Sequence, residues 1–179
     1  ASVGKNITKF EKKIAKLTKS KYSVSCNSGT SALHVALKIF VKREDEVLVP
    51  TITFISTINS INYNNCNPIF MDVDDFYNID EDKTIEFLKK NTFQKNKFCF
   101  NKQTKKRISA IIIVSVWGAP PNINKLLVEC KKRNIKIVED ATEALGSFYL
   151  TGKFKDKHTG TLGDVGCLSF NGNKIITTG

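Results

Sequence analysis

The run ISAIIIVSV, residues 108–116, decides the fold of this chain. A nearly continuous stretch of β-branched apolar residues is typical of a strand that is covered on both faces, as the strands of parallel sheets are. Residues 122–133 follow with the apolar spacing of a helix, and residues 135–139 form the next strand-like run. Strand, helix and strand in this order predict two parallel strands joined by a crossover helix.

The same alternation continues toward the N-terminus. Phe10, Ile14 and Leu17 recur at helical spacing among lysines, which predicts an amphipathic helix. The segments predicted between that helix and residue 108 are a strand at 22–26, a helix at 30–41, a strand at 46–49, a helix at 54–63, a strand at 68–71, a helix at 82–90, and a loop or hairpin at 93–107. The fold class that follows is α/β, with a mostly parallel central sheet between two layers of helices.

The pattern changes after Gly146. Short apolar runs at 147–149, 165–169 and 175–177 alternate there with glycine-rich turns. We expect these runs to be closing strands of the sheet, some of them antiparallel.

Length and composition fit one globular domain. The 179 residues are enough for a sizeable core, and 41% hydrophobic with 25% charged residues argue against disorder. No apolar run approaches the length of a membrane span and no signal peptide opens the sequence, so we expect a cytoplasmic protein without a membrane partner. The sequence starts at Ala1 and stops at Gly179, directly after an apolar run, and we expect that both ends are cut.

The charge balance is basic, with a net charge of +11 and 28 lysines and arginines. Many lysines lie along the first helix and within residues 89–107, which a solvated surface explains, although attraction of an anionic small molecule or of nucleic acid stays open. No nucleic-acid-binding motif accompanies the charge, so we expect no nucleic-acid partner. The five cysteines lie far apart without a CxxC pair, which predicts a reducing compartment and no metal site.

Ligands of an open α/β sheet bind beyond the carboxyl ends of its strands, and four segments of this chain fall there. In Ser28-Gly29-Thr30-Ser31, hydroxyls and free N–H groups at the start of a helix can hold a phosphate, while an ordinary capped turn explains the same residues. Asp140 follows a strand, where a carboxylate can keep a pyridine nitrogen protonated. A helix N-cap is the alternative for Asp140.

The other two segments offer a nucleophile and an aromatic ring. Lys174 follows a strand and a turn of small residues, and a lysine in an apolar or cationic setting loses its proton more easily and attacks aldehydes. A surface lysine is the alternative. Phe54 lies just after a strand that ends at Pro50, where its ring could stack on a flat cofactor or pack in the core.

In their order and spacing these segments resemble the DegT/StrS family of sugar aminotransferases, which share the aspartate-aminotransferase fold (fold type I). The serine five residues before the lysine and the pattern EDAxxAxG are the most specific parts of the resemblance. The stretches that carry it are SVGKNITKFEKKIA, CNSGTSALHVAL, DEVLVPTITFISTINSI, NPIFMDVD, VWGAPPNI, IVEDATEALGS and GDVGCLSFNGNKIITTG.

The resemblance implies that residues 1–179 are most of the PLP-binding large domain of such an enzyme, without its small C-terminal domain. It implies pyridoxal 5'-phosphate (PLP) as the cofactor, Lys174 as the lysine of the Schiff base (the internal aldimine) and the carrier of the proton, and Asp140 as the partner of the pyridine nitrogen. The other cofactor residues that it implies are Gly29, Thr30, Ser31 and Ser169 at the phosphate, Phe54 stacked on the ring, and Glu143, where many members have glutamine.

The implied reaction passes an amino group from an amino acid, usually glutamate, to a keto-sugar linked to a nucleoside diphosphate, in an enzyme that is a homodimer when intact. Related sugar dehydratases have histidine in place of Lys174, and Ser115 stands where many members have a histidine. The lysine-rich stretch before Ile108 resembles that of members acting on 4-keto amino sugars. A non-catalytic domain that binds PLP or a nucleotide-sugar is the alternative, and a chain without the C-terminal domain is expected to be inactive alone.

Overall fold

The central strand of the computed structural model, which describes residues 4–178, is β5 (Arg107–Val114). It pairs in parallel with β1 (Glu46–Pro50) on one side and with β6 (Lys136–Asp140) on the other. The sheet continues in parallel to β2 (Asn67–Met71) beyond β1 and to β7 (Val165–Cys167) beyond β6. Because all five strands run the same way, their carboxyl ends form one edge of the sheet.

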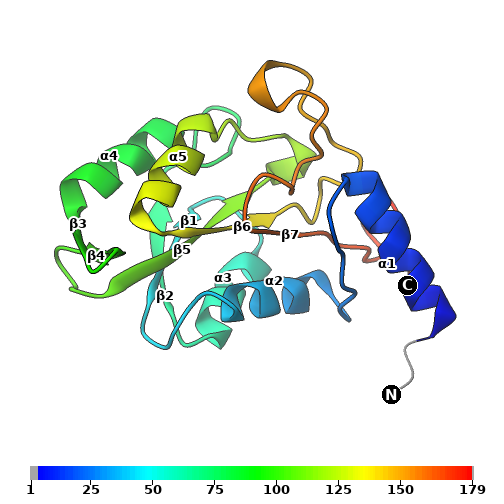
Figure 1. Cartoon of the computed structure of the whole chain (residues 1–179), viewed down its shortest axis with the longest axis horizontal. Coiled ribbons are helices and arrows are strands. Elements are labelled where there is room, and N and C mark those ends of the chain that lie inside the picture. The colour runs from blue at the N-terminus through cyan, green and yellow to red at the C-terminus, as the bar shows by residue number, and fades with distance from the viewer. Residues whose placement is uncertain (1–3, 179) are drawn as a thin grey trace.

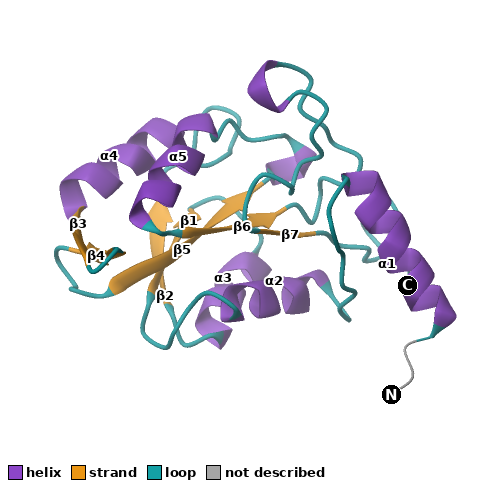
Figure 2. Cartoon of the chain, in the orientation of Figure 1, coloured by secondary structure: helices purple, strands orange, loops and turns teal. Residues whose placement is uncertain are grey.

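Helices cover both faces of this sheet, as Figures 1 and 2 show. The side chains of β5 alternate, so Ala110 and Ile112 point into one apolar cluster while Ile111 and Ile113 point into the other. The first cluster includes residues of α2 (Gly29–Lys38) and α3 (Ile55–Tyr63), and the second includes residues of α4 (Glu81–Asn91) and α5 (Asn124–Arg133). The predicted three-layer α/β/α architecture is therefore confirmed.

The polar stretch before β5 is a hairpin, which the sequence predicted as one of two possibilities. β3 (Thr92–Lys95) and β4 (Phe98–Asn101) pair antiparallel, and β4 pairs antiparallel with the first residues of β5. The Arg107 guanidinium binds the largely buried Asp45 carboxylate where the hairpin joins β5. The hairpin extends the sheet at the end opposite the carboxyl edge and leaves that edge open.

Three of the predicted strands, at 22–26, 147–149 and 175–177, are wrong. Residues 22–26 have no strand partner and run as an extended connection, and residues 175–177 form neither a strand nor a helix. Of the closing segment only β7 joins the sheet, in parallel with β6, while Phe148 makes an isolated antiparallel bridge to His158. A short apolar run forms a strand only if a neighbour supplies its hydrogen-bond partners, and these three runs lie outside the sheet.

The first helix, α1 (Lys5–Thr18), is peripheral. Thr18 is its single buried residue, and its apolar side packs through Phe10, whose ring meets Phe170 edge to face at 4.8 Å. Its Glu11 side chain accepts hydrogen bonds from the backbone and hydroxyl of Ser25, at 2.8 Å each. No helix within residues 4–178 has the length and apolarity to cross a bilayer.

Candidate functional site

The carboxyl edge of the sheet brings together segments that are far apart in sequence. In the sheet register Val114 lies beside Asp140, and Asp140 lies beside Cys167, so β5, β6 and β7 end level with one another. The chain leaves β7 toward Lys174, while the N-terminus of α2 approaches the same edge. The candidate residues therefore converge where the rule for open α/β sheets places a ligand.

Asp140 is the buried acid of this edge, with 3% of its surface exposed. Its Oδ2 accepts a hydrogen bond from the Thr57 hydroxyl at 2.6 Å, and its Oδ1 accepts one from the Thr142 hydroxyl at 2.8 Å. Burial raises the pKa of Asp140, and the two hydroxyls and the nearby Lys174 ammonium lower it by less. Asp140 is thus a buried acid fixed by two hydroxyl donors at the carboxyl edge of the sheet.

Glu139, the residue before it, points to the opposite face and closes a loop. Its carboxylate accepts hydrogen bonds from the backbone N–H groups of Gly160, Leu162 and Gly163, at 3.0, 2.6 and 2.5 Å. Burial raises the pKa of Glu139, and these three donors partly offset the rise. Glu139 therefore has a structural role: it fastens the loop that leads into β7.

Replacing Glu139 with alanine is expected to destabilise the domain by about 3 kcal/mol or more, because three backbone donors lose their acceptor in a buried place. Glu139→Gln keeps one acceptor oxygen and should lose less. Chemical denaturation of the three proteins measures the difference. Equal stability of Glu139→Ala and the unsubstituted protein would show that water replaces the carboxylate at no cost.

Lys174 is held by an acid. Its Nζ lies 3.0 Å from Glu143 Oε1, and the other oxygen of Glu143 accepts a hydrogen bond from the backbone N–H of Trp117 at 3.2 Å. The Lys174 side chain is 18% exposed. Glu143 thus links the lysine after β7 to the turn after β5.

Hydroxyl groups gather at the N-terminus of α2. The Ser28 side chain caps the helix by accepting from the backbone N–H of Ser31 at 3.1 Å, and the Thr30 hydroxyl donates to Ser56 at 3.0 Å. The capped turn that the sequence left as the alternative is therefore present. A cap and an anion site are compatible, because the first turn of a helix has more free N–H groups than one side chain can satisfy.

Gly29 shows how closely three segments approach one another here. A Cβ atom at this position would lie 3.1 Å from Ser169 Cβ and 3.2 Å from Thr142 Cγ2. Ser169 is buried, and its hydroxyl accepts from the Asn171 backbone N–H at 3.4 Å. The start of α2 thus packs against the exits of β6 and β7, so closely that a Cβ at position 29 would require the Ser169 and Thr142 side chains to shift.

The side chains of two other residues named in the sequence analysis, Phe54 and Ser115, make no hydrogen bond to the residues described above. Phe54 precedes α3 and its side chain is 74% exposed, so it does not pack in the core. Ser115 is buried, and its hydroxyl has no hydrogen-bond partner within residues 4–178. The Phe54 ring is thus largely exposed, and the Ser115 hydroxyl is buried without a hydrogen-bond partner among the described residues.

Sequence reasoning missed Thr57 and Thr142, the donors to Asp140, and the contact between Glu143 and Trp117. Thr142 stands in the EDAxxAxG stretch, but a hydroxyl two residues after an acid is too common to signal a role. Thr57 is separated from Asp140 by 83 positions. Neither contact could be read from local spacing.

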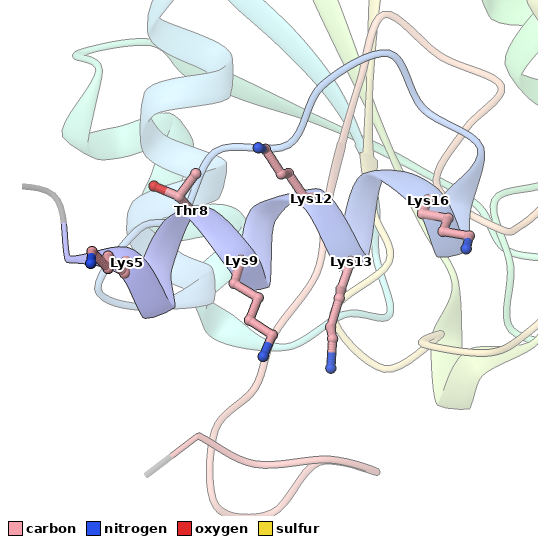
Figure 3. A pocket seen from close by; sticks show the side chains of 6 residues that line it. All are labelled: Lys5, Thr8, Lys9, Lys12, Lys13 and Lys16. Atoms are coloured by element: carbon pink, nitrogen blue, oxygen red, sulfur yellow. The ribbon is translucent and has the colours of Figure 1, made fainter.

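A hollow of about 380 Å³ lies along α1, and none of its lining residues belongs to the candidate site (Figure 3). Its lining is the stems of five lysines and a threonine: Lys5, Thr8, Lys9, Lys12, Lys13 and Lys16. It offers positive charge but no acid, nucleophile or buried polar group of its own. We therefore assign the candidate site to the carboxyl edge of the sheet.

The chain is similar to known proteins over its whole length. The model of the DegT/DnrJ/EryC1/StrS aminotransferase family matches residues 1–179. GDP-perosamine synthase of Escherichia coli O157:H7 is 36% identical over 180 residues, covering 100% of this chain and 44% of that protein. The chain thus spans less than half the length of this relative.

Two solved structures also match nearly the whole of this chain and less than half of their own length. The aminotransferase from Psychrobacter cryohalolentis superposes with a TM-score of 0.80 at 29% identity, over 98% of this chain and 40% of that one. The E. coli GDP-4-keto-6-deoxy-D-mannose-3-dehydratase with bound hydrated PLP superposes with a TM-score of 0.78 at 26% identity, over 98% and 42%.

Proposed function

Because the chain belongs to the DegT/DnrJ/EryC1/StrS aminotransferase family, we propose that the protein is a PLP-dependent aminotransferase acting on a nucleotide-linked keto-sugar. The amino donor in this proposal is an amino acid, glutamate first among them. Residues 1–179 form the large PLP-binding domain, and the intact enzyme acts as a homodimer. The sugar synthase and the PLP-bound dehydratase described above support the substrate class and the cofactor.

The observation that carries the proposal is the convergence of Lys174 and Asp140 on one edge. A side-chain amine can join the aldehyde of PLP, and a buried carboxylate can hold the proton of its ring nitrogen. A cationic ring nitrogen beside Asp140 would also favour the ionised form of this acid, which burial alone opposes. PLP supplies an electron sink for the carbanion that forms when the substrate loses a proton.

The phosphate of PLP fits the hydroxyl-rich start of α2. Thr30, Ser31 and Ser169 are the proposed hydroxyl donors, together with the first N–H groups of the helix. Gly29 lets the backbone come close, since any Cβ here would crowd Ser169 and Thr142. No three His, Cys, Asp or Glu side chains in the described part of the chain are grouped so that they could hold a metal ion.

Each remaining residue has a proposed task. Lys174 takes and returns the proton of the reacting carbon as general base and acid. Glu143 positions the Lys174 amine through the 3.0 Å contact and lies beside the cofactor. Phe54 offers its exposed ring for stacking on the cofactor.

Lysine at position 174 favours amino transfer over dehydration, since the related sugar dehydratases use histidine there. Purified full-length protein mixed with PLP should show an absorbance band near the visible range. Borohydride should fix the cofactor on the peptide that contains Lys174, and glutamate should shift the band before reduction. A colourless protein, or label on other lysines alone, would refute the proposal, and binding without a response to any amino donor would favour a non-catalytic binding domain.

A further inference from the structure

Thr57 is a buried hydroxyl in the first turn of α3, with 0% of its surface exposed. Buried serines and threonines inside helices commonly donate to a carbonyl of the preceding turn. Ser60 does so in this helix, donating to the Thr57 carbonyl at 2.7 Å. The Thr57 hydroxyl instead leaves its helix and donates to Asp140 Oδ2 at 2.6 Å. The formation of α3 does not require this bond, so its role lies with the acid.

A second hydroxyl fixes the direction of this hydrogen bond. Thr53, in the connection between β1 and α3, donates to the Thr57 hydroxyl oxygen at 2.8 Å. A hydroxyl has a single proton, so Thr57 accepts from Thr53 and gives its own proton to Asp140. Hydrogen bonds in such a chain polarise and strengthen one another. Thr53 and Thr57 together form what we call the hydroxyl chain.

The hydroxyl chain favours the ionised form of Asp140. A carboxylate only accepts hydrogen bonds, whereas a neutral carboxyl group also has a proton of its own to donate. Thr57 donates to one oxygen of Asp140 and Thr142 donates to the other. Burial raises the pKa of Asp140, and the Thr57 hydroxyl is the strongest of the influences that lower it. The hydroxyl chain thus opposes the penalty that burial places on the charged acid.

The protonation state of Asp140 decides how a pyridine nitrogen can bind to it. An ionised Asp140 accepts a hydrogen bond from a protonated ring nitrogen, whereas a neutral Asp140 would donate to an unprotonated one. Only the protonated ring is cationic and draws electrons strongly from a substrate carbanion. A hydroxyl that holds Asp140 in the ionised form therefore acts on the cofactor through the acid.

We propose that Thr57, supported by Thr53, is a positioning residue that keeps Asp140 ionised and oriented toward the protonated ring nitrogen of PLP. This inference rests on the proposed function and adds to it a residue that acts through Asp140. Without the Thr57 hydroxyl, burial would leave Asp140 protonated in the PLP-free protein, and cofactor binding would have to remove that proton first. The resulting loss of affinity depends on the ring nitrogen alone.

The test compares two ligands of the full-length, PLP-free protein. One is PLP, and the other is its deaza analogue, in which a C–H group replaces the ring nitrogen while the aldehyde and the phosphate stay. Thr57→Val removes the hydroxyl and keeps the shape of the side chain. It is expected to raise the Kd for PLP about tenfold, as loss of a hydrogen bond to a charged group should. The Kd for the analogue should change less than about twofold, and absorbance titration measures both constants.

Three further variants define the effect. Thr57→Ser restores the hydroxyl and should bind PLP as the unsubstituted protein does. Thr53→Val leaves the bond from Thr57 to Asp140 but removes its polarisation, and should raise the Kd for PLP about threefold. Ser60→Ala removes another buried hydroxyl of α3, one that donates to a carbonyl of its own helix. This matched control should bind both ligands normally.

An equal loss of affinity for both ligands in Thr57→Val would show that the hydroxyl only supports folding, and it overturns the inference, as does unchanged PLP affinity. If chemical denaturation shows that Thr57→Val does not fold, the half-buried Thr53 decides: Thr53→Val must lose affinity for PLP and not for the analogue. An unsubstituted protein that binds both ligands equally well refutes the inference alone, provided that borohydride fixes PLP on Lys174. Failure to take up PLP refutes the proposed function itself.

Discussion

Amino transfer by the Lys174→Ala variant is expected to fall roughly a thousandfold or more, and PLP should no longer be fixed by borohydride. The variant loses the nucleophile that joins the cofactor and the general base that moves the substrate proton, and the second role alone contributes about 10²–10⁴. Single-turnover absorbance changes with glutamate measure the loss. Because proton transfer needs an amine, added methylamine should restore part of the rate.

Two control variants separate the loss of the reactive amine from the effects of a changed charge and of a folding defect. Lys174→Arg keeps a cation opposite Glu143 but cannot form the covalent link, so it should be as inactive as Lys174→Ala and should not respond to methylamine. Lys83→Ala removes another ion-paired lysine, 2.9 Å from Asp72 on an exposed surface, and should transfer normally. Full activity of Lys174→Arg would contradict the assignment of Lys174.

Replacing Asp140 with asparagine is expected to have two opposite effects. Amino transfer should fall by roughly 10²–10³, because a neutral amide no longer stabilises charge on the ring nitrogen as the reaction proceeds. The PLP-free protein should at the same time gain about 1 kcal/mol of stability at neutral pH, because a buried carboxylate is removed. Thermal denaturation without PLP and steady-state transfer with PLP measure the two effects.

The pH dependence of the stability gain follows from the raised pKa of Asp140. Below the unfolded pKa of about 4 the acid is protonated in both states, so it contributes no penalty. Above that pH the unfolded chain releases the proton while burial disfavours its release from the folded chain, so this group lowers stability as pH rises. The advantage of Asp140→Asn should therefore be absent near pH 3 and grow toward pH 7.

Asp75→Asn removes one exposed negative charge and serves as the control for the change in net charge. It should alter neither the stability profile nor amino transfer by more than a small amount. A loss of stability in Asp140→Asn across the whole pH range would mean that the Thr57 and Thr142 hydrogen bonds outweigh the burial penalty. The proposed role of Asp140 in transfer would then be judged from the kinetic effect alone.

Much of the candidate site follows from local sequence once the fold class is known. The apolar run at 108–116 and its flanking helix and strand predict a parallel sheet, and parallel strands bring their carboxyl ends to one edge. Asp140 ends β6 and Lys174 follows β7, so both lie toward the carboxyl edge as a consequence of topology. The roles of Gly29, Thr30, Ser31, Phe54, Glu143 and Ser169 in cofactor binding stay predictions, since the structure gives their positions and not their ligand.

The errors concern segments at the margin of the sheet. Residues 22–26, 147–149 and 175–177 have the apolar character of strands, but a strand requires a partner in register, and local composition does not reveal whether one is present. The run at 165–169 was also predicted as a strand, and it forms one over Val165–Cys167 because β6 offers free hydrogen-bonding groups beside it.

The sequence by itself determined the layers of the fold, the order of its elements and the sheet edge that carries the candidate site. Hydrophobic periodicity is a local property that distinguishes helices from strands, and the crossover rule then fixes the relative direction of the strands. Only the tertiary structure decided which hydroxyls bind Asp140, that Glu139 instead closes a loop, and that Glu143 joins Lys174 to the turn of Trp117. These contacts depend on side-chain distances between segments that meet only after folding. The physical reason is that a hydrogen bond requires atoms within about 3 Å, and chain order carries no such distance between remote residues.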